Sequence, residues 1–123
     1  MEQKNFTDMM NDIAACAGKE IEVECVELED EHITPQTFEG MLWEHAPFKR
    51  QINIEDEHGI GHLIPFFGKA CFIKSITVKG GDLVYVQDIK MPEALSDESE
   101  WRTIINGHLD ALGGKARESF LLP

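Results

Sequence analysis

The chain of 123 residues is long enough for one domain with a single buried core, and its 42% hydrophobic content is ordinary for a globular protein. No apolar run approaches the roughly 18 residues of a transmembrane helix, and no basic segment leads into an apolar stretch as in a secretory signal. Three cysteines without Cys-x-x-Cys spacing predict reduced core residues of a cytoplasmic protein, not a disulfide or metal framework: Cys16, Cys25 and Cys71.

The net charge of −12 argues against wholesale binding of duplex nucleic acid, because phosphate contacts need a basic surface. The acidity is mainly N-terminal. Residues 1–32 carry ten acids and two lysines, whereas residues 33–92 carry seven acids and six basic residues. The composition therefore still allows a local basic surface in the middle of the chain.

Two amphipathic helices are predicted, one near each end. Apolar residues recur at helical spacing over 6–17, and Gly18 is expected to end a helix over 6–18. A second helix is predicted over 96–113, where Ser96 can cap the first turn and Gly113-Gly114 can end the helix. The tail over 114–123 is expected to dock on the barrel or to contact a neighbouring chain.

Between the helices, residues 19–90 predict a strongly bent antiparallel sheet. Residues 20–28 alternate apolar and acidic, and their parity flips at Cys25-Val26, as at a bulge. A strand over 37–44 contains Gly40, whose missing side chain permits a bend. Strand character follows at 51–55, 62–67, 69–78 and 83–87, with turns at 56–61 and 79–82. A solvated turn is predicted for the acidic run Glu27, Glu29, Asp30 and Glu31.

Three stretches, in this order, resemble the Sm and Sm-like (Lsm, Hfq) family. Asp8-Met9-Met10 through Gly18–Val23 is similar to the family's opening helix and first strand, and Phe38-Glu39-Gly40-Met41-Leu42 to the core of its first motif. Val78–Val86 is similar to the second motif, usually Ile-Arg-Gly followed by a hydrophobic strand. The resemblance, over residues 6–87, implies an SH3-like five-stranded antiparallel barrel behind an N-terminal helix. The helix over 96–113 would be an addition, all within one domain of residues 1–123.

The resemblance also implies a ring of subunits. The family joins the fourth strand of one subunit to the fifth of the next. Here the strand over 83–87 is apolar on both faces, so it needs cover on both sides or a partner strand. The subunit seam is therefore expected at Leu83, Val84, Tyr85 and Val86.

A site for single-stranded RNA is the family's usual function. Its implied residues here are Lys79 and Gly80 in the second motif, facing Phe48, Lys49 and Arg50. An aromatic ring with cations can stack a base and meet its phosphate without reading the sequence.

The chain departs from the family where bases are read. Ala46 and Arg50, or Pro47 and Gln51 if one residue is inserted, stand where the family has an acid and an asparagine. Two alternatives therefore stay open. One is an acidic protein-binding or inhibitory module that mimics nucleic acid and binds a basic partner. The other is a purely structural ring.

No catalytic, cofactor or metal site is predicted. His58 and His62 have the spacing of a helical metal pair beside Glu57, but Gly59 and Gly61 oppose a helix there. The sequence has no nucleophile-elbow context for a serine and no phosphate-binding glycine loop. We expect a binding protein, not an enzyme.

Overall fold

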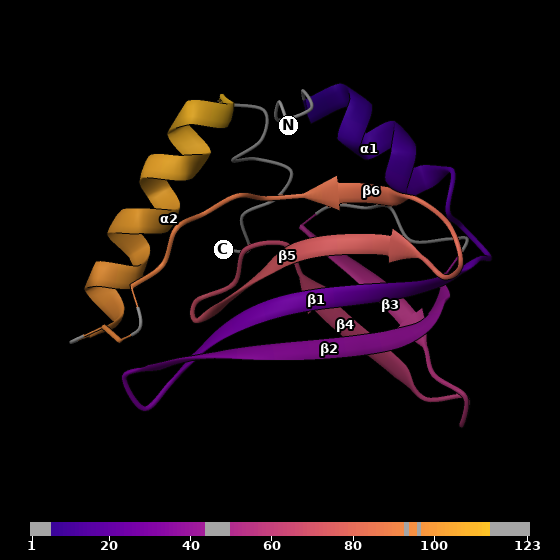
Figure 1. Ribbon diagram of the computed structural model, residues 1–123, viewed down its shortest axis with the longest axis horizontal. Coiled ribbons are helices and arrows are strands. Elements are labelled where there is room, and N and C mark those ends of the chain that lie inside the picture. Colours follow the sequence, from indigo (N-terminus) through magenta and orange to yellow (C-terminus); the bar gives the residue numbers. More distant parts are fainter. Residues whose placement is uncertain (1–5, 44–49, 93, 96, 114–123) are drawn as a thin grey trace.

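The computed structural model describes residues 6–43, 50–92, 94–95 and 97–113, with side-chain exposure from residue 8 onward. The protein is mainly β with two helices, as predicted (Figure 1). The elements are α1 (Phe6–Ala14), β1 (Glu20–Glu29), β2 (His32–Leu42), β3 (Gln51–Glu55), β4 (Gly61–Pro65), β5 (Cys71–Val78), β6 (Leu83–Val86) and α2 (Glu98–Leu112). None of the described helices is both long and apolar enough to cross a membrane.

The strands form one open antiparallel sheet of six strands in the order β4-β3-β2-β1-β5-β6. The resemblance implied five strands, which is one fewer than the sheet contains. A tight turn separates β4 from β5, because the Gly68 amide donates to the Cys71 carbonyl at 2.7 Å. A Cβ atom on Gly68 would lie 2.9 Å from the Cys71 sulfur, so only glycine fits this turn without a shift. Beyond the turn, the Ile73 amide donates to the Phe66 carbonyl and draws β5 toward the end of β4.

The predicted bend at Gly40 is where β3 leaves β2. The two strands pair only through Met41 and Leu42. A Cβ atom on Gly40 would lie 2.5 Å from the Glu55 carbonyl oxygen, so the missing side chain is what lets β3 pass so closely. In Figure 1, the β3–β4 arm accordingly crosses behind β1 and β2 instead of running beside them.

The alternation of β1 is confirmed, and so is the irregularity near Cys25. Ile21, Val23 and Cys25 are buried, whereas Glu20 and Glu22 are exposed on the outer face. The register of β1 against β5 shifts between Glu24 and Cys25.

The turn between β1 and β2 is shorter than predicted. Glu27 and Glu29 belong to β1, and the turn is only Asp30 and Glu31, with φ of 47° and 69°. Two successive left-handed residues match the twist of a hairpin, so β2 begins at His32 instead of residue 37. Pro35 is tolerated within β2 because its nitrogen faces away from β1.

The core lies between the inner face of the sheet and the two helices. Trp101 of α2 packs against Phe72 with ring centroids 5.7 Å apart, and both rings are buried. The N-cap of α2 is Asp97, whose carboxylate accepts from the Ser99 and Glu100 amides, and not the predicted Ser96, which lies outside the described residues. Gly113 ends α2 as predicted.

α1 ends at Ala14, earlier than predicted, and turns follow up to Gly18. Gly18 is left-handed, with φ of 81°, but its amide donates to the Leu42 carbonyl and so joins the turn to β2.

Candidate functional site

The described residues line a cleft of about 410 Å³ where β3 leaves β2. Its lining comes from the start of β1, the end of β2, the end of β3 with its following turn, and the residue after β5: Glu20, Glu39, Gly40, Met41, Glu55, Asp56, Glu57, His58 and Lys79. Five of the nine residues carry carboxylates and one is a lysine. The cleft therefore has a strongly negative potential and favours a cation.

Strand register brings these distant residues together. Glu20 lies opposite Met41, and Met41 lies opposite Glu55, so the three side chains share the outer face of the sheet. The Lys79 amide donates to the Glu20 carbonyl at 3.0 Å, so Lys79 lies beside Glu20. Glu39 lies two residues before Met41 and is exposed on the same face.

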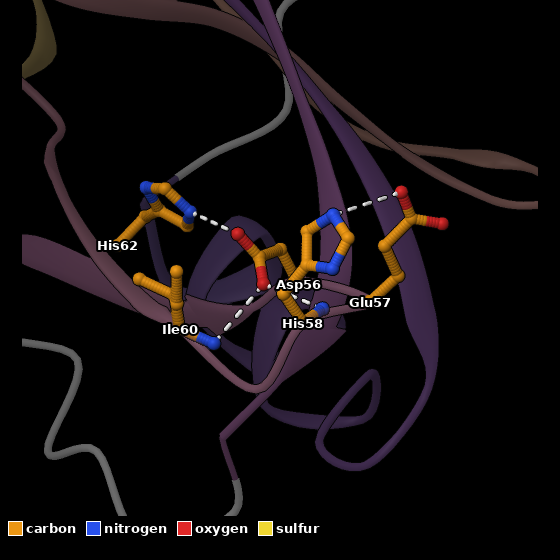
Figure 2. A network of polar contacts seen from close by, with 5 residues as sticks. All are labelled: Asp56, Glu57, His58, Ile60 and His62. Atoms are coloured by element: carbon orange, nitrogen blue, oxygen red, sulfur yellow. Dashed lines mark hydrogen bonds and ion pairs between the residues drawn. The ribbon is translucent and has the colours of Figure 1, made fainter.

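The turn after β3 is held by Asp56, as Figure 2 shows. One carboxylate oxygen accepts from the His58 and Ile60 amides at 2.9 and 3.0 Å, and the other contacts His62 Nε2 at 2.8 Å. The His62 hydrogen bond, with those of the two amides, lowers the pKa of Asp56 to about 2. Asp56 is thus fixed as an anion, and it shapes the turn that lines the cleft.

An apolar strip adjoins the cleft on the outer face. Met41 is 40% exposed, and Trp43, directly after β2, is 42% exposed. The Trp43 amide donates to the Asn53 carbonyl, and Asn53 pairs with Leu63 of β4, which is 63% exposed. Three large apolar side chains thus lie in solvent beside five carboxylates.

The structure separates the residues predicted to bind RNA. Lys79 lies among the carboxylates of the cleft, and its Nζ atom is 3.5 Å from the Glu20 carboxylate. Gly80 forms the predicted turn with φ of 73°. Arg50 precedes β3, about 17 Å of strand away from the cleft residue Glu55. Phe48 and Lys49 lie outside the described residues.

The predicted seam strand, β6, ends the sheet next to β5. Tyr85 is buried in the chain's own core, with its ring centroid 5.3 Å from that of Phe66, whereas Leu83 is 39% exposed. Val84 and Val86 are half-buried. The pairing of β6 with a second subunit stays a prediction.

The histidines and cysteines lie in separate environments. Glu57 contacts the His58 ring at 3.4 Å, while His62 bonds to Asp56. Across the described ranges, no group of three or more His, Cys, Asp or Glu is arranged to hold a metal ion. The three cysteines are free thiols.

Sequence reasoning missed the cleft because four separate segments build it. The one available signal was parity, since Glu20, Glu22 and Glu24 alternate with buried residues and so had to share one face. Placing Glu39 and Glu55 on that face required the strand register. Comparison with protein-family models, with curated proteins and with solved structures finds no match for the chain.

Proposed function

We propose that this protein is a binding module whose acidic cleft holds a cationic segment of a partner protein. The observation that carries the proposal is the cleft lining, with five carboxylates and one lysine around about 410 Å³. A lysine or arginine side chain entering this space would form charge-assisted hydrogen bonds with carboxylates such as Glu39 and Glu55. The negative surface would also speed the approach of a basic partner.

The apolar strip supports a peptide ligand over a simple cation. Met41, Trp43 and Leu63 offer contact area for apolar side chains beside the cleft. An indole face also attracts ammonium and guanidinium groups. A segment that alternates or mixes cations with apolar residues matches both features, whereas a polyanion matches neither.

An Sm-like ring that binds single-stranded RNA is the second candidate. The order of the first five strands, with Ile73 hydrogen-bonded to Phe66 across the gap between β5 and β4, supports a partly closed Sm-like barrel. RNA binding is less favoured, because a phosphate at Lys79 would approach Glu20 and the other carboxylates of the cleft. Three free thiols fit the reducing cytoplasm that we propose as the compartment.

Fluorescence anisotropy at low salt separates the two candidates. A labelled arginine- and lysine-rich peptide should bind, and the double change Glu39→Gln with Glu55→Gln should weaken it roughly tenfold, because two cleft charges are lost. The matched control is Glu98→Gln with Glu100→Gln, which removes the same charge from α2 at the other end of the sheet (Figure 1). Oligouridine binding that Lys79→Ala and Arg50→Ala abolish would establish the RNA candidate instead.

Light scattering tests the ring separately. A monomer at micromolar concentration would remove the support for both the RNA-binding ring and the purely structural ring. It would leave the peptide-binding proposal intact, since every residue lining the cleft comes from one chain.

A further inference from the structure

Among the residues that the structure describes, no strand covers most of the outer edge of β2. β3 pairs with β2 only at Met41 and Leu42, and an isolated bridge to Ala94 covers the other end at His32. Between these contacts, residues 34–40 pair only with β1 among the described residues. This open edge leads directly into the cleft, which begins at Glu39.

Hydrogen bonds on either side of Leu42 identify the backbone groups that point outward. The Leu42 amide and carbonyl bond to the segment before β1, whereas the Trp43 amide bonds to β3. Backbone groups alternate along a strand, so Glu39 and Thr37 point away from β1 and each offers one N–H and one C=O. Pro35, the next outward residue, offers only a C=O.

Side chains along this edge separate into a charged face and an apolar face. Glu39 lies directly opposite Glu22 on the outer face, an unfavourable pairing of two carboxylates. Phe38, the residue between Thr37 and Glu39, points inward, where its half-buried ring lies 6.1 Å from that of His62. A strand added here would therefore meet carboxylates on one face and an aromatic ring on the other.

We propose that a partner protein adds one strand to the open edge of β2, with cationic and apolar side chains in alternation. Residues opposite Glu39 and Thr37 would place cations beside Glu39, Glu22 and Glu24, and the residue between them would cover Phe38. The inference rests on the proposed function and specifies how the cationic segment is held. Backbone hydrogen bonds would provide affinity, and the alternation would provide specificity.

Charge argues for a partner of different sequence and against a second copy. Two β2 edges of this chain, paired with each other, would bring Glu22 and Glu39 of one copy beside the acidic face of the other. The nearby hairpin end adds Glu29, Asp30 and Glu31, all exposed. A basic strand lowers this repulsion, whereas an identical strand increases it.

Two short labelled peptides of identical composition test the mode of binding on the unmodified protein. One alternates lysine with valine, and the other carries its lysines and valines in two blocks. Strand addition predicts that the alternating peptide binds about tenfold more tightly, because only it can direct all cations to one face while pairing with the edge. Equal affinities, both weakened by Glu39→Gln with Glu55→Gln, would overturn strand addition and leave the proposed function standing.

Thr37→Pro tests the edge itself. It removes one outward N–H that β1 does not use, and Pro35 shows that this strand accommodates proline at an outward position. Binding of the alternating peptide should fall about tenfold or more, because the added strand loses one backbone donor. Circular dichroism shows whether the Thr37→Pro variant folds. If it does not fold, the comparison of the two peptides on the unmodified protein is the test of strand addition.

The remaining outcomes are equally decisive. If neither peptide binds, the proposed function fails and strand addition fails with it. A wild-type dimer in analytical ultracentrifugation that Thr37→Pro converts to a monomer would assign the edge to a second copy and overturn the proposal.

Discussion

The Glu55 carbonyl oxygen lies 2.5 Å from the position that a Cβ atom on Gly40 would occupy. Gly40→Ala must therefore push β3 away from β2, and we expect it to lower the free energy of unfolding by about 1–3 kcal/mol. Urea unfolding measures the change. The control is Gly107→Ala in α2, where none of the described residues outside the adjacent helix turns comes within 4 Å of the added methyl group and about 0.5–1 kcal/mol of stabilisation is expected. A Gly40→Ala variant as stable as the wild type would contradict the close passage of β3.

Asp56→Asn should destabilise the protein in a pH-dependent way. The folded-state pKa of Asp56 is lowered from 3.8 to about 2, so its contribution to stability is fully present above the higher value and is lost as pH falls through the lower one. The stability difference between wild type and Asp56→Asn should stay constant near neutral pH and shrink between these two values. Urea unfolding across the acid range measures it, with Glu57→Gln as the matched charge change on the neighbouring residue. A difference that does not vary with pH would contradict the role of Asp56 in the turn.

We expect a second pH dependence of stability, near neutral pH, from His108. Its ring is half-buried in α2 and bonds to the buried Gln87 at 2.6 Å. Burial lowers the pKa of His108 below its ordinary 6.5, while Asp88 opposes the shift. Stability from the neutral ring is therefore present above the ordinary pKa and lost as pH falls below it.

The wild type should accordingly lose more stability than His108→Gln between about pH 7.5 and about pH 5. Guanidinium unfolding at the two pH values measures the difference between the proteins. Equal losses in both proteins would show that burial of His108 carries no such cost.

Cys25 should be almost inert in the folded protein. It is 3% exposed, and burial, with the neighbouring Cys71, raises its pKa to about 12. Iodoacetamide should label all three cysteines in denaturant but leave Cys25 unlabelled in native buffer, as mass spectrometry of tryptic peptides can show. Labelling of native Cys25 at the denatured rate would contradict its place in the core.

Local patterns in the sequence predicted the elements but only part of their limits. Period-two alternation identified β1, and Gly40 identified the bend, because both signals reside within one segment. The predicted extent of the turn between β1 and β2 was wrong, because Asp30 and Glu31 adopt left-handed conformations without a glycine to signal them. The predicted start of β2 at residue 37 was too late. Pro35 lies in the missed part, because a proline disrupts a central strand but is tolerated where its nitrogen faces an open edge.

The candidate site was beyond local patterns. Glu20, Glu39, Glu55 and Lys79 meet only because the register aligns three strands and a turn. The same register separates Lys79 from Arg50, which the resemblance to the Sm family had placed in one RNA site. The composition predicted that the protein is acidic, but it could not predict where on the fold the carboxylates gather.

A two-dimensional ¹⁵N–¹H NMR titration with an unlabelled cationic peptide shows whether the acidic cleft binds a cationic segment. Binding in the cleft should change the chemical shifts mainly at Glu39 to Met41, Glu55 to His58 and Lys79, with little change in α2. Added salt should reverse them, because the attraction is electrostatic. Shifts that are absent, or that appear at these positions only with oligouridine, would contradict binding of a cationic segment in the cleft.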